Sequence, residues 1–448
     1  MQDYVIPGYN RVREGLLKQE RTHIETLLES TKSTWAEKGI TICSDGWLDP
    51  QRRPIINFVV VSDKAPMFLR ADNCEGQYKS KEYIAEKLNG IIEEVGRHNV
   101  VQIITDNATN CKGAGLIIES EYDNIFWTPC VVHTLNLALK SICEPKIGNN
   151  PSDEELFAWG ELEFMYDVKT EAAMINNFIM NHGMRLSMFN EFSPLKLLSI
   201  VEIRFASVVC MLKRFVEVKI ALQQMVINDK WSVYREVRDD SPTPTAQIVK
   251  DLILSDVWLD KVDYILKITT PIYEMIRMTD TDTPCLHLVY EMWDSMIEKV
   301  KKVIYRYEGK QEDEESNIIA KSGLKKVLAV NHPTRIKSQP ASSSCCERNW
   351  STYSFVHSVK RNALTPERAE DLVFVHSNLR HLSRRTDAYK TGETRMWDVG
   401  RDSFDSLGGV GILEVADLSL DEPELQAVSF GLDELPVDIV DDNETIEE

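Results

Sequence analysis

The sequence lacks the features that mark several large classes of protein. No apolar run reaches the ~20 residues that a membrane-spanning helix needs, and the longest, around residues 55–61, is far shorter. No basic segment followed by an apolar one opens the chain, so no secretory signal is expected. The nine cysteines are an odd number without framework spacing, which is typical of a reducing compartment. These absences predict a soluble intracellular protein with no membrane partner.

Glycine-rich phosphate-binding motifs and Cys-x-x-Cys pairs are missing as well. What the chain does have is 448 residues with 43% hydrophobic side chains, which is enough for real cores and excludes a wholly disordered chain. Its net charge of −20 is unevenly distributed, because residues 401–448 hold 15 acidic side chains and one basic one. Residues 1–400 therefore carry only −6. The acidity does not exclude DNA as a partner.

The N-terminal segment (8–37) has apolar residues that form a partial stripe at helical spacing, and short β-rich runs follow it. The first run is expected to end in a turn at Ser44-Asp45-Gly46. The order βββαβαβα predicts an antiparallel meander followed by parallel crossovers, in a mixed α/β sheet of the RNase H-like class. The expected elements are strands at 40–44, 54–61 and 67–71, a helix at 83–95, a strand at 100–104, a helix, a strand at 125–128 and a helix from about 131.

Helical periodicity punctuated by prolines dominates the next part of the chain, and a second helical unit follows a polar stretch. Thr365-Pro366-Glu367 is a strong helix start, and the helix after it has an apolar face of Leu372, Val373, Leu379 and Leu382. We divide the chain into a helical lead-in (1–38), an RNase H-like core (39–145), an all-α insertion (146–307), a linker or truncated segment (308–340), a C-terminal helical region completing the core (341–400) and an acidic disordered tail (401–448).

Two carboxylates follow strands that the topology makes parallel neighbours. Asp45 ends the first strand and Asp106 ends the fourth, so both are expected at the same edge of the sheet, where ligands gather. Paired carboxylates repel unless a cation lies between them, and hard oxygen ligands suit Mg²⁺ or Mn²⁺. Asp before Gly or Asn is also common in turns, and motif content alone favours that simpler interpretation.

Two cysteine motifs are interpreted as structural. Cys130 and His133 have zinc-like spacing, but no second pair lies nearby to complete four ligands, so a role at the start of a helix is favoured. Cys345 and Cys346 are adjacent and are expected to be buried thiols. Spacing gives Glu347, the next residue, no role beyond that of an acid near a helix start.

Three tryptophans of the helical region invite two interpretations. Their rings are able to stack on an extruded base, but the apolar helical period already accounts for them as core residues. Core packing is therefore the favoured interpretation for Trp231, Trp258 and Trp293.

Several unusual strings occur in one order along the chain, among them Ser44-Asp-Gly-Trp47, Phe126-Trp-Thr-Pro-Cys130 and Ser344-Cys-Cys-Glu-Arg-Asn-Trp-Ser351. They resemble the plant hAT-superfamily transposase-like proteins. The first two strings are similar to a block known there as a domain of unknown function, and the third is similar to the hAT dimerisation region.

The resemblance implies an RNase H-like core interrupted by a helical insertion, in a nuclear protein that pairs with itself and with DNA. It implies an acid triad at Asp45, Asp106 and Glu347, which would hold Mg²⁺ or Mn²⁺ if the protein is active. Cys130 and His133 match a motif beside the active site of the family. The apolar face of Leu372, Val373, Leu379 and Leu382 falls in the dimerisation region.

Three functional hypotheses follow. The first is a transposase-derived nuclear protein that dimerises, is a candidate for DNA binding and has a vestigial catalytic core. The second is an active metal-dependent transposase that cuts and joins DNA by transesterification. The absence of a BED-type zinc finger from the sequence and the shortened insertion favour the first. A third, an RNase H-like exonuclease, requires an Asp-x-Glu pair on the first strand. It is disfavoured because Gly46 and Trp47 follow Asp45.

Overall fold

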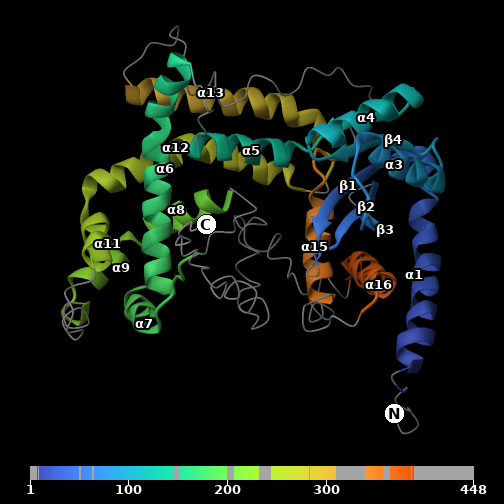
Figure 1. Cartoon of the computed structure of the whole chain (residues 1–448), viewed down its shortest axis with the longest axis horizontal. Coiled ribbons are helices and arrows are strands. Elements are labelled where there is room, and N and C mark those ends of the chain that lie inside the picture. Colours follow the sequence, from blue (N-terminus) through green and yellow to red (C-terminus); the bar gives the residue numbers. More distant parts are fainter. Residues whose placement is uncertain are drawn as a thin grey trace, which may run out of the picture. The chain divides into compact units, whose positions relative to one another are not determined.

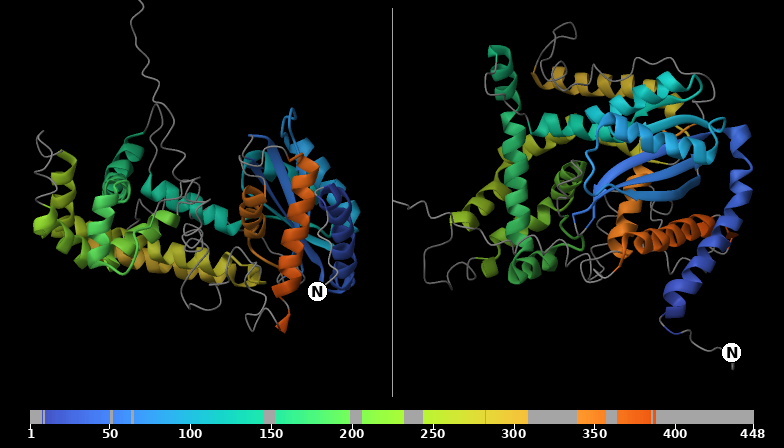
Figure 2. Two further views of the ribbon diagram at one scale, coloured as in Figure 1. Left: turned by 90° about the horizontal axis from the view of Figure 1, so that it is seen from below. Right: turned by 45° about the vertical axis from the view of Figure 1, so that its right-hand side comes forward.

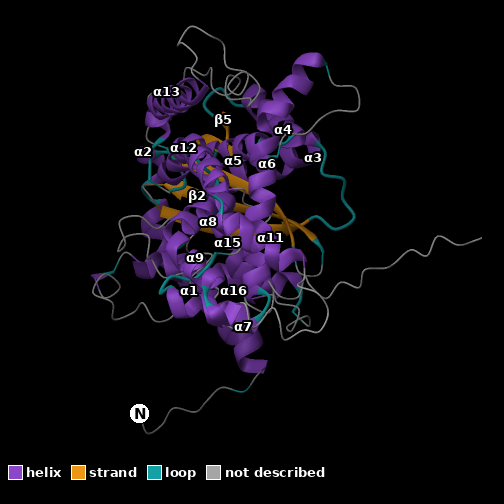
Figure 3. Cartoon of the chain, turned by 90° about the vertical axis from the view of Figure 1, so that its left-hand side faces the viewer, coloured by secondary structure: helices purple, strands orange, loops and turns teal. Residues whose placement is uncertain are grey.

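The computed structural model describes residues 8, 10–49, 52–62, 65–144, 152–198, 206–231, 244–281, 283–308, 339–356, 364–384 and 386–387. Most of the proposed linker and the whole of the acidic tail therefore lie outside the described residues. The described elements form a mixed α/β fold (Figure 1), with the strands and helices distinguished by colour in Figure 3.

Five strands form one mixed sheet in the order β3-β2-β1-β4-β5. β1 pairs antiparallel with β2 and parallel with β4, and β5 pairs parallel with β4. The expected meander and parallel crossovers are therefore confirmed, as is the fold class. The strands are β1 (Ile40–Leu48), β2 (Pro54–Ser62), β3 (Ala65–Asn73), β4 (Val100–Thr105) and β5 (Phe126–Pro129).

The expected turn at residues 44–46 is wrong. β1 runs on to Leu48, because Asp45, Gly46 and Trp47 each pair with a residue of β2. Pairing with β4 extends only as far as Cys43, opposite Ile104. The antiparallel partner thus overrides a local Asp-Gly turn signal, while Asp45 still lies just beyond the end of the parallel pairing.

Helices cover the sheet and form the rest of the described chain. Ser80 caps α3 by accepting a hydrogen bond from the Tyr83 amide, and Gly96 ends it at φ 84°. Gly115 of α4 allows close packing on β5, because a Cβ there would lie 2.2 Å from the Trp127 ring. The helices around the sheet are η1 (Arg11–Leu16), α1 (Leu17–Lys32), α2 (Trp35–Lys38), α3 (Lys81–Val95), α4 (Thr109–Glu121), α5 (Val131–Cys143), α15 (Ser344–Val356) and α16 (Pro366–Arg384).

The chain between residues 152 and 308 is helical wherever the structure describes regular elements, as expected for an all-α insertion. Trp231, Trp258 and Trp293 are 2%, 5% and 7% exposed, so their rings pack in its core. No described helix is long and apolar enough to cross a membrane. The elements are α6 (Asp153–Met180), α7 (Gly183–Phe192), α8 (Ala206–Glu217), α9 (Lys219–Ile227), α11 (Pro244–Leu254), α12 (Asp256–Thr279), η2 (Leu286–Leu288) and α13 (Val289–Glu308).

Residues 339–356 return to the sheet and pack on one face of β1 and β2. The Thr41 hydroxyl lies 2.8 Å from Oε1 of Gln339, 298 positions away in the sequence. Two residues on, the Cys43 thiol lies 3.8 Å from the Ser342 carbonyl. Because alternate residues of a strand share a face, these contacts define the side of the sheet that receives α15.

α16 lies against the edge strand β3 and beside α1, as Figure 2 shows. The Asn378 side chain accepts a hydrogen bond from the Phe68 amide at 3.1 Å and donates one to the Phe68 carbonyl at 2.9 Å. Asn378 is 0% exposed. One side-chain amide therefore satisfies two main-chain groups of an edge strand, which would otherwise lack partners.

We expect Asn378→Ala to lower the free energy of unfolding by about 2–4 kcal/mol, because it leaves a buried donor and a buried acceptor unpaired. Chemical denaturation of the full chain measures this change. Asn89→Ala is the matched control, since the Asn89 side chain bonds only to the exposed Glu121 carboxylate in the described contacts. Equal effects of the two substitutions would contradict this role of Asn378.

Candidate functional site

The parallel register of β1 and β4 brings the two predicted aspartates to the same edge. Cys43 pairs with Ile104, so the same register continued by two residues sets Asp45 opposite Asp106. Parallel neighbours are about 4.8 Å apart, which places both carboxyl groups at the carboxyl ends of adjacent strands. Asp106 begins the turn into α4, where its Oδ1 accepts a hydrogen bond from the Ala108 amide at 3.1 Å.

α15 contacts the Asp45 end of β1 through aromatic side chains. The Trp350 indole N–H donates to Asp45 Oδ2 at 2.7 Å, and the same ring stacks on Trp47 at 5.0 Å between centroids. Asn57, opposite Asp45 on β2, donates through Nδ2 to the Cys346 carbonyl at 3.0 Å. The first turns of α15 are thus held on the sheet at the position of the acid. No sequence pattern indicated this hydrogen bond of Trp350.

Of the three aromatic residues that the sequence of α15 offers as anchors, two are buried. Trp350 and Tyr353 are 8% and 2% exposed, whereas Phe355 is 36% exposed and contributes less. Phe355 lies two residues from Tyr353, close to the opposite side of the helix.

The pKa of Asp45 is raised from 3.8 to about 7, chiefly by burial and also by the charges of Glu347 and Asp106. The Trp350 indole and the Gly46 amide act in the opposite direction by bonding to the carboxylate. Asp45 is therefore affected by both other predicted acids, one at the end of β4 and one on α15. Like charges in a half-buried site favour a cation or a proton between them.

Glu347 reaches this neighbourhood on α15, which begins at Ser344. The pKa of the Cys130 thiol is raised from 9.0 to about 11, mainly by burial and in part by the charge of Glu347. Within the described ranges, however, no three His, Cys, Asp or Glu side chains are grouped closely enough to hold a metal ion as they stand. The charges of Asp106 and Glu347 therefore affect Asp45, but the three carboxylates do not form a three-ligand metal site as they stand.

Cys130 has a structural task at the start of α5. Its thiol accepts from the His133 amide at 3.5 Å, which caps the helix, and from the Ser343 amide at 3.4 Å. The Val131 amide also donates to the Ala341 carbonyl at 3.0 Å. Cys130 therefore ties α5 to the segment that leads into α15. The His133 side chain is half-buried one helical turn from Cys130.

The adjacent thiols Cys345 and Cys346 are 6% and 0% exposed, which confirms the expectation that both are buried. Neither forms a disulfide among the described residues. Their helix presents Glu347 directly after them, so packing of the thiols helps to hold that acid in place.

The predicted dimerisation face on α16 is partly covered within the chain. Val373 is 0% exposed, and Leu372, Leu379 and Leu382 are half-buried. α1 contributes to this packing, since Arg21 pairs with Asp371 and lies 4.6 Å from the centroid of the Phe374 ring. Val373 therefore belongs to the core of this chain, whereas the three leucines keep part of their surface exposed.

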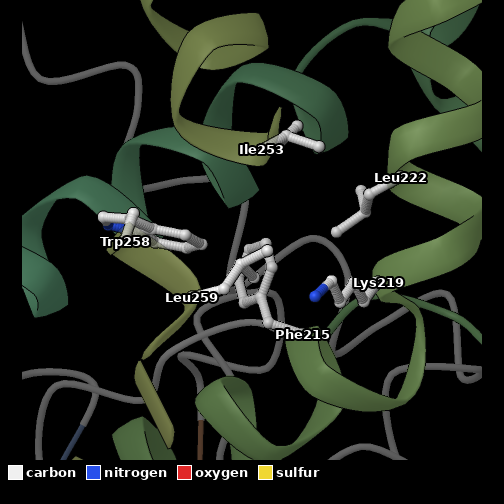
Figure 4. Close-up of a pocket in the computed structure, with 6 residues that line it drawn as sticks. All are labelled: Phe215, Lys219, Leu222, Ile253, Trp258 and Leu259. Carbon is white, nitrogen blue, oxygen red and sulfur yellow. The ribbon is translucent and has the colours of Figure 1, made fainter. Parts of the chain in front are cut away.

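A pocket in the helical region is a separate feature from the acids. Figure 4 shows its lining from α8, α9, α11 and α12, with one lysine among apolar side chains. Trp258 contacts Phe215 edge-to-face at 6.3 Å and donates to Glu171 at 2.8 Å. These contacts make Trp258 a core residue with a bonded indole. We assign the pocket no chemistry.

Comparison with family models gives a match. A family model described as a domain of unknown function, DUF659, matches residues 7–168, a little over a third of the chain. This domain is found in hAT-like transposase-related proteins, which agrees with the resemblance of the sequence. No curated protein matches the chain. The match spans η1 to α5 and part of α6, and therefore includes Asp45 and Asp106 but not Glu347.

Asp45→Asn should stabilise the protein at pH 8 more than at pH 5. The pKa of Asp45 is higher in the folded chain, so ionising it costs stability as pH rises from about 4 to about 7, and the full cost remains above that range. Asn removes the charge and still accepts from Trp350. We expect Tm to rise by about 2–4 °C at pH 8, in EDTA, and less at pH 5.

Thermal melts at both pH values measure this difference. Asp123→Asn is the control, because that carboxylate is exposed on the turn before β5. A gain for Asp45→Asn that is independent of pH would contradict burial and acidic neighbours as the cause of the raised pKa.

Proposed function

We propose that this chain is a hAT transposase-derived nuclear protein that associates with itself, binds DNA through its RNase H-like core, and has lost efficient strand transfer. The observation that carries this proposal is that Asp106, after β4, and Glu347, on α15, both act electrostatically on Asp45 of β1. Their neighbours in sequence also resemble the family's acid motifs. Domesticated or inactive copies of such proteins would keep this fold and lose the chemistry.

The donor chemistry supports a divalent cation at this edge. Asp45 and Asp106 would hold Mg²⁺ or Mn²⁺ through hard carboxylate oxygens, with Glu347 as the third acid. When bound, such a metal would activate an attacking oxygen and stabilise a leaving one on a phosphodiester. The looser grouping of the three acids and the engagement of Asp45 Oδ2 by Trp350 favour the less active of the two candidates.

The second candidate function is an active metal-dependent transposase. The electrostatic coupling of both other acids to Asp45 favours it, because a competent site needs all three carboxylates at one phosphodiester. The two candidates share every residue of the site. They differ in whether DNA that binds is also cut.

A binding and cleavage assay on the full chain separates them. We expect a labelled DNA duplex to bind, with no cleavage above background when Mn²⁺ is added. Cleavage that depends on Mn²⁺ and is lost in both Asp45→Asn and Glu347→Gln would establish the active transposase instead. A chain that binds no DNA under any of these conditions would overturn both candidates.

Self-association has its own test at the partly exposed leucines of α16. Leu372→Asp should convert a dimer into monomers, because a carboxylate desolvated in an apolar interface costs several kcal/mol. Light scattering measures the mass, and circular dichroism checks that the variant folds. Leu137→Asp, at a 45% exposed position on α5, is the matched control and should leave the dimer intact. A monomeric wild type at micromolar concentration would contradict this part of the proposal.

A further inference from the structure

Lys79 places an ammonium group beside the acid edge of the sheet. It lies between β3 and α3, and a Cβ built on Gly46 would be 3.5 Å from its Nζ. Gly46 directly follows Asp45 on β1. The Asn110 side chain, four residues after Asp106, donates to the Lys79 carbonyl at 2.9 Å and so ties this loop to the start of α4. Lys79 is thus positioned beside the residue that follows Asp45 and by the helix that follows Asp106.

The ammonium of Lys79 lies beside Gly46, the residue after Asp45, and no ion pair among the described residues neutralises it. The lysine is half-buried, and no carboxylate of the described residues forms an ion pair with it. Its neighbour Lys81 differs, since Lys81 lies 3.7 Å from Glu82 and is 55% exposed. A half-buried lysine without an ion pair among the described residues has an anion from outside the chain as its natural counter-ion.

We infer that Lys79 binds a phosphate of the DNA backbone that lies across the Asp45–Asp106 edge. The inference rests on the proposed function, because it says how a site with acidic side chains would bind negatively charged DNA. Carboxylates repel phosphates, and a lysine next to them offsets this repulsion while leaving the acids unblocked. A phosphate contact of this kind positions the strand and carries no sequence preference.

Tyr78, directly before Lys79, adds an uncharged contact to the same loop. It is 82% exposed, the largest value among the large hydrophobic side chains that the structure describes. Aromatic rings in such positions stack on bases or sugars. Tyr78 and Lys79 therefore differ in a measurable way, because only the lysine releases counter-ions when DNA binds.

Fluorescence anisotropy of a short labelled DNA duplex, titrated with potassium chloride in a Ca²⁺ buffer, tests the inference. We expect Lys79→Ala to weaken binding about fivefold and to reduce the slope of log K against log salt by about 0.9. Lys79→Arg should restore most of both, since it keeps the charge. Lys81→Ala is the charge-matched control, and Tyr78→Ala should weaken binding without changing the slope.

Each contrary outcome has a distinct meaning. If the wild type binds DNA and Lys79→Ala behaves as Lys81→Ala does, the assignment of Lys79 is overturned while the proposed function stands. If Tyr78→Ala lowers the slope as much as Lys79→Ala, damage to the loop explains the effect and the assignment is also overturned. If the wild type binds no DNA, the proposed function fails and the inference fails with it.

Discussion

One face of β1 is the constraint on which the site depends. Alternate residues of this strand share a face, and every one of them from position 41 to 47 contacts the segment 339–356. Two of the contacts are buried polar ones, which are costly if either partner is missing. The chain between the partners is about 300 residues long, yet closure entropy grows only with the logarithm of length, so a helical insertion is tolerated there. Glu347 acts on Asp45 because this face is completed from the far end of the chain.

The same face explains the electrostatics of the site. A half-buried Asp45 with two acidic neighbours would be unstable if it had no bonded donor, and the Trp350 indole supplies one from α15. The helix that brings the repulsive charge of Glu347 therefore also brings a donor that partly offsets it. Docking of α15 and ionisation of Asp45 are linked in consequence, because each changes the free energy of the other.

Much of the fold was predictable from the sequence, whereas the site was predictable only in part. β-branched runs and apolar periodicity indicated the strands, the helices and the parallel pairing of residues 40–44 with 100–104, since these depend on neighbours in sequence. The Asp45–Gly46 turn was predicted wrongly, because pairing with β2 outweighs a local turn preference. Trp350 and Lys79 carried no local signal at all. Their roles depend on which residues face Asp45 and Gly46 after the chain has closed.

The family match stops before the helices that complete the sheet. The match ends at residue 168, so it contains the whole sheet but not the helices that complete it. Without residues 339–384, Thr41 and Asn57 would lose partners from α15 and its lead-in, and the edge of β3 would lose Asn378. Burying these groups unpaired, or exposing the apolar face beside them, would each cost free energy. The sheet and the two helices that complete it are therefore discontinuous in sequence, and Asp45 and Glu347 come from these two separate stretches of the chain.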